Sequence, residues 1–251
     1  MALSTLEVRA FDRTERVQPL PPTAARPHAW RALIGIDLDV RPGAYRVSVS
    51  GGSDAGTTIT EHTLRVATKA FRTRRLSVDP DFVNPPESEA ARITRETATI
   101  EAAWEGSNGP DPAPGLSFVA PVPHKANSAF GTRSVFNGEV RNAHSGADFL
   151  SPTGTPIKAP APGTVVLAED LYFSGGAVIV DHGLGIVSLF AHMSKIVATP
   201  GADVAQGEVL GLVGATGRVT GAHLHWTVRV NGARVDPLSL VALLRRPQSR
   251  P

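Results

Sequence analysis

Segment 221–226 reads Gly-Ala-His-Leu-His-Trp and so puts two histidines, His223 and His225, at alternate positions. Side chains alternate between the two faces of a strand, so both imidazoles point to one side and the leucine and tryptophan to the other. β-Favouring residues follow, and Asn231-Gly232 is a strong signal for a tight hairpin turn. The sequence therefore predicts a β-hairpin whose first strand brings two imidazoles into one small volume.

A second pair of metal-binding side chains, His144 and Asp148, lies earlier in the chain. Their spacing puts them on one face of a helix or of a strand, and the glycine and small residues between them favour a strand or loop. A catalytic zinc site commonly has three protein ligands and keeps its fourth position for water. His144, Asp148 and one histidine of the His223/His225 pair meet that requirement. The chain has no cysteine and no His-Glu-x-x-His motif, so thiolate ligands and the usual helical zinc-peptidase signature are excluded.

Three segments together resemble the blocks of a known enzyme family. They are 144–149 (HSGADF), 181–192 (DHGLGIVSLFAH), and Gly-Ala-Thr-Gly at 214–217 running into 221–225 (GAHLH). In order and spacing they are similar to the M23 (lysostaphin/LytM-type) zinc metallopeptidases, and the resemblance covers roughly residues 118–240.

The resemblance implies a role for five side chains, all of which are intact in this sequence. His144, Asp148 and His225 would bind Zn²⁺, while His192 and His223 would stand beside the metal without ligating it and act in catalysis. The implied reaction is hydrolysis of peptide cross-links in bacterial cell-wall peptidoglycan through a metal-bound water. Retention of all five positions favours an active enzyme, because some relatives have lost ligands and act only as binding or activating modules.

Other residues of the three segments are predicted to have structural roles or to position the site. Phe190 replaces the tyrosine usual in the family two residues before His192, which removes only a hydroxyl. Strand alternation predicts that Ser188, Phe190 and His192 share one face, so that His192 can look toward the metal groove. His182 lies in a turn-like Asp-His-Gly sequence and is predicted to orient that turn. Segment 214–221 lacks the Gly-Lys-Ser/Thr ending of a phosphate-binding loop and is predicted to be the loop that leads into the His223 strand.

The pattern of the whole chain predicts a mainly β protein in four parts. Residues 1–28 are predicted to be an N-terminal arm with little regular structure, and residues 29–83 a β-sandwich of immunoglobulin-like size. Residues 84–117 are predicted to form a helix and a linker, and residues 118–251 an antiparallel β peptidase domain of the LytM type.

Local patterns supply the expected elements of the first domain and the connecting helix. Residues 32–40 and 45–49 alternate around a Pro-Gly turn and are predicted to pair as a hairpin. Asn84 and Pro85 are suited to a helix start. An apolar stripe at helical spacing is predicted to pack on a neighbouring domain; it consists of Ile93, Thr97, Ile100 and Trp104. The Pro-rich and Gly-rich segment 106–115 is predicted to be the linker.

Charge and hydropathy narrow the possible partners and locations. A net charge of +2 with a pI of about 9.3 is ordinary for a soluble protein, and no nucleic-acid partner is predicted. No apolar run is long enough to cross a bilayer. The wall substrate implies a periplasmic or extracellular location, with a leader or anchor outside this sequence. The Arg-rich segment 71–75 could contact an anionic glycan or simply be a solvated face.

Two other classes of function are considered. A non-catalytic module that binds the wall or activates a hydrolase could use the same scaffold. A lipoyl or biotinyl carrier is suggested by glycine-spaced segments such as 204–210, but no lysine follows Lys195 to carry the group. The oligomeric state, the bond that is cleaved and the role of the N-terminal domain are not predicted.

Overall fold

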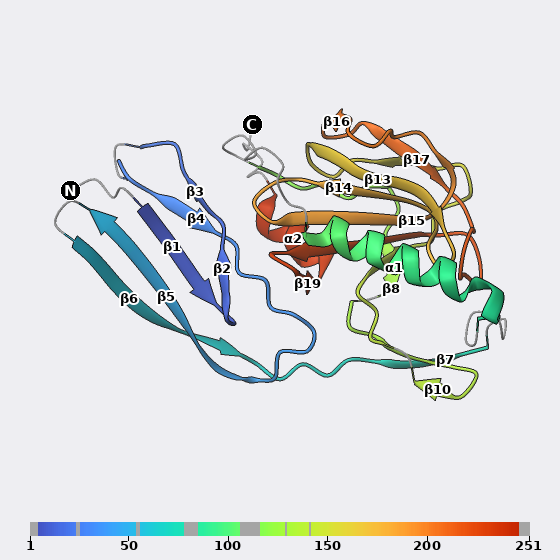
Figure 1. Cartoon of the computed structure of the whole chain (residues 1–251), viewed down its shortest axis with the longest axis horizontal. Coiled ribbons are helices and arrows are strands. Elements are labelled where there is room, and N and C mark those ends of the chain that lie inside the picture. Colours follow the sequence, from blue (N-terminus) through green and yellow to red (C-terminus); the bar gives the residue numbers. More distant parts are fainter. Residues whose placement is uncertain are drawn as a thin grey trace.

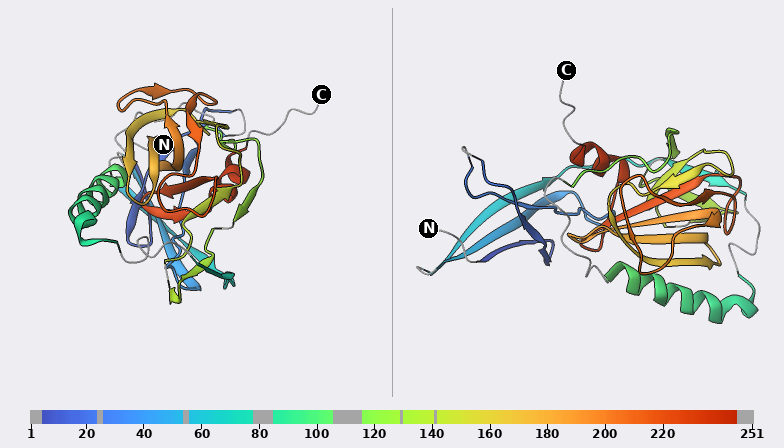
Figure 2. Two further views of the ribbon diagram at one scale, coloured as in Figure 1. Left: turned by 90° about the vertical axis from the view of Figure 1, so that its right-hand side faces the viewer. Right: turned by 90° about the horizontal axis from the view of Figure 1, so that it is seen from above.

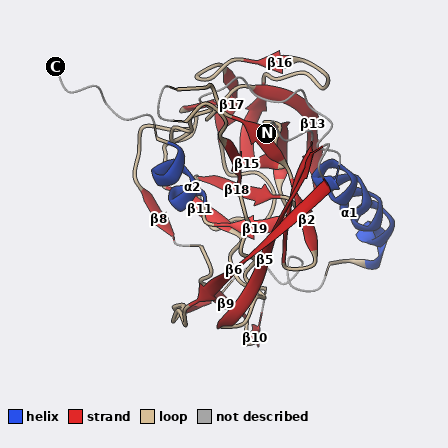
Figure 3. Ribbon diagram, turned by 90° about the vertical axis from the view of Figure 1, so that its left-hand side faces the viewer, coloured by secondary structure: helices blue, strands red, loops and turns tan. Residues whose placement is uncertain are grey.

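The computed structural model describes residues 5–23, 26–53, 56–77, 85–105, 116–128, 130–140 and 142–245. Strands dominate these residues (Figure 3), so the prediction of a mainly β chain is confirmed. The N-terminal strands gather at one end of the molecule and a large sheet occupies the other, with one long helix lying along that sheet (Figures 1 and 2). No helix among the described residues combines the length and apolar character needed for a membrane span.

The N-terminal strands form a four-stranded antiparallel sheet in the order β2-β1-β5-β6 and a separate pair, β3-β4. Their bounds are β1 Thr5–Ala10, β2 Arg13–Glu15, β3 Val17–Pro19, β4 Trp30–Ala32, β5 Gly43–Ser53 and β6 Gly56–Val66. Val8, Ala10 and Val47 form a small buried core, whereas most of β6 is exposed. The described residues therefore do not confirm an immunoglobulin-like sandwich.

Two predictions for this part are wrong. The expected unstructured arm, residues 1–28, contains β1, β2 and β3, because β1 pairs with β5 far along the chain and no local pattern signals that pairing. The hairpin expected between residues 32–40 and 45–49 does not form. Leu33 packs against the main core and Ile34 against the small N-terminal core, so the alternation reflects packing between two cores.

The large antiparallel sheet has ten strands, in the order β16-β13-β14-β15-β18-β11-β8, with β12, β17 and β19 attached beside this path. Their bounds are β8 Ala126–Ser128, β11 Gly146–Phe149, β12 Pro156–Lys158, β13 Gly163–Leu171, β14 Gly175–Asp181, β15 Ile186–Ile196, β16 Asp203–Val204, β17 Val209–Val213, β18 Leu224–Val230 and β19 Ala233–Val235. The antiparallel β core expected from the sequence is confirmed, as is the hairpin between β18 and β19. Asn231 and Gly232 both have positive φ angles, of 48° and 80°, as a tight turn of this kind requires.

A third, three-stranded sheet joins distant parts of the chain. It has the order β10-β9-β7, with bounds β7 Thr73–Leu76, β9 Arg133–Phe136 and β10 Glu139–Val140. Strand β7 runs parallel to β9, so a strand from before the long helix is placed beside residues that lead into β11. Strand β7, which contains most of the Arg-rich segment 71–75, therefore belongs to this sheet and not to the N-terminal one.

The long helix α1 (Ala90–Glu105) follows a 3-10 turn, η2 (Glu87–Glu89). Trp104 and Ile100 pack against buried residues of β13, β14 and β15, which confirms the predicted packing for these two residues of the stripe. Thr97 is exposed instead, and Glu96 is buried in its place, with Oε2 accepting a 2.7 Å hydrogen bond from the Tyr172 amide. Pro85 precedes the helix; Asn84 and the predicted linker at 106–115 lie outside the described residues.

A short C-terminal helix, α2 (Pro237–Leu244), was not expected from the sequence. Asp236 is its N-cap and accepts a hydrogen bond from the Leu238 amide, and Pro237 occupies the first turn. Leu240, Val241 and Leu244 extend the main core. The helix thus closes one side of the large sheet.

Polar contacts hold the segment after β4 against the β18-β19 hairpin. The Arg234 guanidinium and its backbone amide both donate to the Asp37 carboxylate, at 3.0 Å for Nε and 2.8 Å for the amide. Asn231 donates to the Leu33 carbonyl at 3.2 Å. A Cβ at Gly35 would lie 2.6 Å from the Val230 carbonyl oxygen, so only glycine permits this approach. The N-terminal part is therefore fixed to the large sheet at the turn that ends β18.

Candidate metal centre and active site

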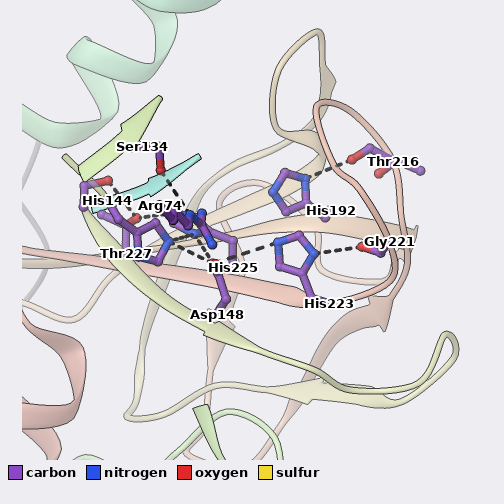
Figure 4. A network of polar contacts seen from close by, with 11 residues as sticks. Arg74, Ser134, His144, Asp148, His192, Thr216, Gly221, His223, His225 and Thr227 are labelled. Carbon is purple, nitrogen blue, oxygen red and sulfur yellow. Dashed lines mark hydrogen bonds and ion pairs between the residues drawn. The ribbon is translucent and has the colours of Figure 1, made fainter. Parts of the chain in front are cut away.

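Three donor atoms converge at one end of the large sheet (Figure 4). Asp148 Oδ1 lies 2.9 Å from His144 Nε2 and 2.8 Å from His225 Nδ1, and the two nitrogens are 3.1 Å apart. All three residues are buried or half-buried. The structure thus brings together the three side chains that the sequence singles out as metal ligands.

His225 meets His144 and Asp148, which precede it by 81 and 77 positions in the sequence. The register of the strands explains how. Asp148 on β11 and Ala191 on β15 both lie directly opposite His225 on β18, so all three share one face of the sheet. Leu224 and Trp226 point into the main core on the other face, as the alternation predicts. Directly paired residues on neighbouring strands, Asp148 and His225, therefore supply two of the three donors.

Close approach of β11 to β18 depends on a glycine. A Cβ at Gly146 would lie 2.3 Å from the Trp226 carbonyl oxygen, which no side chain could tolerate. His144 precedes β11, and its backbone is tied down by hydrogen bonds with the Thr132 carbonyl and the Gly131 amide, at 2.8 and 2.7 Å. These constraints aim the His144 imidazole back at Asp148.

His192 and His223 lie beside the three donors. Their rings are 4.7 Å apart between centroids, and His192 is 6.1 Å from the His225 ring. His192 Nδ1 is 2.9 Å from the Thr216 carbonyl and His223 Nδ1 is 2.9 Å from the Gly221 carbonyl. A carbonyl can only accept, so each Nδ1 carries a proton in these bonds, and the neutral form of each ring has its lone pair on Nε2.

His192 reaches the groove by a route that strand alternation does not predict. The sequence predicts that Phe190 and His192 share a face, but Phe190 is fully buried and stacks on Trp226, on the core side. His192 has a φ of 67°, and the pairing of β14 with β15 shifts register next to it. The irregularity turns the His192 imidazole to the face opposite Phe190. Backbone strain of this kind is common at functional sites.

Thr216 and Thr227 support this site and were not singled out from the sequence. Thr216 accepts from His192 through its carbonyl, while its hydroxyl donates to the Met193 carbonyl and accepts from the Gly176 amide. Thr227 Oγ1 lies 2.8 Å from His225 Nε2. Thr227 could have been found from the sequence, because it stands two positions after His225 in the same strand and so on the same face.

Burial and neighbouring charges set the protonation states. Burial alone would raise the pKa of Asp148, but hydrogen bonds and charge interactions with His144 and His225 outweigh it and hold that pKa well below its usual range. Burial, reinforced by His225 and His223, lowers the pKa of His192 to about 3. Burial also lowers the pKa of His225. At neutral pH His192 and His225 are therefore neutral and Asp148 is ionised.

The donor set fits a zinc ion in kind and closely in geometry. Two imidazole nitrogens and one carboxylate oxygen are ligands that Zn²⁺ accepts. Donors about 2.0–2.2 Å from a tetrahedral zinc ion lie about 3.3–3.6 Å from one another. The observed separations of 2.8–3.1 Å need small outward movements to reach that geometry.

The donors open onto a groove of about 540 Å³. Besides the five histidine and aspartate side chains, its walls include Arg74 from β7, Ser134 and Phe136 from β9, and Phe173 and Arg218 from loops. Arg74 was missed as a site residue because β7 reaches the groove only through its pairing with β9. Cation–π contact places the Arg218 guanidinium 4.7 Å from the Phe173 ring centroid.

The other histidines lie away from the groove. His182 is buried and bonds to the Pro162 carbonyl and the Ser188 hydroxyl, both at 2.9 Å, which agrees with the predicted structural role. His124 is exposed and bonds to Ser151, and His28 and His62 are exposed.

Comparison with known proteins gives a consistent result. The model of Peptidase family M23 matches residues 142–237. The DD-carboxypeptidase/endopeptidase Mpg of Neisseria meningitidis serogroup B is 39% identical over 126 residues, which are 50% of this chain and 29% of that protein. The peptidoglycan DD-endopeptidase ShyA of Vibrio cholerae is 39% identical over 95 residues, 38% of this chain and 22% of that protein. The chain thus spans less than a third of the length of either relative.

A solved structure matches a much larger share of this chain. The crystal structure of a Pseudomonas aeruginosa protein described as a peptidase M23 is 36% identical and covers 94% of this chain and 87% of its own, with a TM-score of 0.72. Since the motif blocks, the family model and a likeness across most of the chain agree, this chain belongs to peptidase family M23.

Proposed function

We propose that this chain is a zinc-dependent endopeptidase that hydrolyses the peptide cross-links of bacterial peptidoglycan. The observation that carries the proposal is the convergence of His144 Nε2, Asp148 Oδ1 and His225 Nδ1 within 3.1 Å of one another, beside two further histidines. The substrate class is supported by the names of relatives that match this region, which are peptidoglycan DD-endopeptidases and a DD-carboxypeptidase/endopeptidase.

His144, Asp148 and His225 would hold the zinc ion. When bound, zinc supplies a Lewis acid that polarises the scissile carbonyl and makes water a stronger nucleophile near neutral pH. Thr227 would keep the His225 ring oriented by accepting a hydrogen bond from its Nε2, as outer ligand partners do in zinc sites.

His192 and His223 would move protons. Each ring has its Nδ1 proton committed to a backbone carbonyl, so each offers Nε2 to the groove as a base. The same Nε2 atoms, once protonated, could donate to the developing oxyanion or to the leaving amine. The His223 Nε2 lies 3.9 Å from Asp148 Oδ1, so it faces the reacting centre.

We also propose that residues 118–251 are the peptidase domain, because the large sheet and the five site residues all fall within them. Strand β7, from the preceding part, adds to the wall of the groove. A peptidoglycan substrate would require the protein to act in the periplasm or outside the cell.

The test is to incubate zinc-loaded and chelator-stripped protein with purified peptidoglycan sacculi and to identify the released fragments by mass spectrometry. Zinc-dependent loss of cross-linked muropeptides is the expected result, and the fragment masses also identify the cleaved bond. Asp148→Ala should behave like the stripped protein even after zinc is added. If neither form releases fragments while the protein sediments with the sacculi, a non-catalytic wall-binding role replaces the proposal.

A further inference from the structure

The wall of the active-site groove carries two arginines whose role the proposed reaction leaves open. Arg74 and Arg218 line the same groove as the three donors and the two further histidines. Asp148 is the single carboxylate among the described residues that line it, and it is turned toward His144 and His225. Among the described residues that line the groove, none therefore offers an acidic side chain to the Arg74 guanidinium.

Arg74 is held in a fixed orientation. It lies on β7 directly opposite Ser134 on β9, and its Nε donates to the Ser134 hydroxyl at 3.1 Å (Figure 4). Ser134 is only 4% exposed, so this anchor is rigid. The bond uses Nε and leaves the two terminal nitrogens of the guanidinium for another partner. No acidic side chain in the described part of the chain forms an ion pair with Arg74.

An oriented guanidinium without a carboxylate partner is suited to a planar anion. Arginine donates two parallel N–H bonds to a carboxylate, and such charge-assisted bonds are stronger than neutral ones. Arg218 adds positive charge to the same groove, and its stacking on Phe173 fixes its position. Peptide substrates carry carboxylates, whereas water and neutral amides cannot form this pair.

We propose that Arg74 binds a free carboxylate of the peptide substrate beside the scissile amide, so that the enzyme prefers cross-links in which this group is ionised over those in which it is a carboxamide. The inference rests on the proposed function, which makes a peptide the occupant of the groove. It assigns the choice of substrate to a strand from outside the peptidase domain, since β7 precedes helix α1.

The test uses a pair of cross-linked muropeptides that differ at one group next to the scissile amide, a free carboxylate in one and a carboxamide in the other. Wild-type kcat/KM should favour the carboxylate about 10-fold to 100-fold, the usual range for a charged hydrogen bond. Arg74→Gln should lose about that factor on the carboxylate substrate and change little on the carboxamide, so the preference disappears. The loss should fall mainly on KM.

Arg75→Gln is the matched control. Arg75 is exposed, follows Arg74 on the same strand and therefore points to the other face, and it is not among the groove residues. It removes the same charge and should keep the wild-type preference. If Arg74→Gln lowers kcat/KM equally on both substrates, Arg74 is a structural residue. If kcat/KM rises on both, β7 covers the groove. If the preference is unchanged, the metal binds the carboxylate. Each of these results overturns the inference.

Binding separates this inference from the proposed function. Affinities of the same two muropeptides for wild-type and Arg74→Gln protein, with and without zinc, can be measured by calorimetry. An Arg74-dependent preference in binding without any cleavage would reject the endopeptidase and keep the carboxylate site. Cleavage by the wild type with no preference in either measurement would keep the enzyme and reject the carboxylate site.

Discussion

His225 and Thr227 lie two residues apart on β18, and His225 Nε2 is 2.8 Å from Thr227 Oγ1. Because Nδ1 of the same ring points at Asp148 and His144, the threonine decides which nitrogen is left to bind metal. Thr227→Val should lower zinc affinity about 10-fold to 100-fold, since the ring loses its outer partner at almost unchanged volume. Competition with a chromogenic chelator measures the affinity directly. Thr227→Ser keeps the hydroxyl and should bind zinc like the wild type; a serine variant as weak as the valine variant would contradict the assigned role.

His192 and His223 should be separable from the metal ligands by experiment. Replacing either with alanine should lower kcat by about 10² to 10⁴ while the protein still binds zinc, because each supplies a positioned proton acceptor and not a ligand. Asp148→Ala should instead lose the zinc. Metal content by elemental analysis and turnover of muropeptides distinguish the two outcomes. Loss of zinc in His223→Ala, or full activity in both histidine variants, would overturn the division of roles.

His182 should make the stability of the fold depend on pH. Burial lowers the pKa of His182 to about 4 from an ordinary value near 6.5. The unfolded chain therefore takes up a proton between pH 6.5 and 4 that the folded protein does not, so stability is full above that window and falls as pH drops through it. The loss between pH 7 and pH 5 should be about 2 kcal/mol.

Denaturant unfolding of chelator-stripped protein at both pH values measures this loss without the proton linkage of metal binding. His182→Asn should be less stable at pH 7 but lose less stability on going to pH 5. His124→Asn, at an exposed histidine, should keep the pH dependence of the wild type. Equal pH dependence in wild-type and His182→Asn protein would exclude His182 as the source.

Local periodicity was sufficient to predict the β18–β19 hairpin and the faces of Leu224, His225 and Trp226 on β18. Alternation predicted that His225 and Trp226 point to opposite faces of β18, and the Asn-Gly turn predicted where β18 ends. It failed at His192, because the positive φ and the register shift at that position come from the neighbouring strand. No window of sequence contains that information.

The N-terminal part was predicted less well for the same reason. Strand β1 owes its form to β5, and the alternation at 32–40 reflects two cores that only the folded chain brings together. Arg74 illustrates the consequence for function. Its strand is visible in the sequence, but its place in the groove depends on a parallel pairing with Ser134, 60 residues away.

Asp37 and Arg234 hold the N-terminal part to the large sheet, and this contact should be measurable by itself. Burial alone would raise the pKa of Asp37, but hydrogen bonds from Arg234 outweigh it and lower the pKa to about 2. Asp37→Asn should cost about 1 kcal/mol at pH 7, because the pair is partly exposed to solvent. Asp39 also contacts Arg234 but its side chain is 89% exposed, so Asp39→Asn should cost much less.

The sign of the pH effect follows from the lowered pKa of Asp37. The folded protein keeps this carboxylate ionised where the unfolded chain protonates it, so the contribution is present above about pH 4 and is lost as pH falls toward 2. The difference in stability between wild-type and Asp37→Asn protein should therefore shrink when unfolding is repeated near pH 3. Hydrogen exchange at segment 33–42 should rise in Asp37→Asn at pH 7 and stay at the wild-type rate in Asp39→Asn. Equal effects of the two substitutions would show that the Asp37–Arg234 pair does not hold the N-terminal part in place.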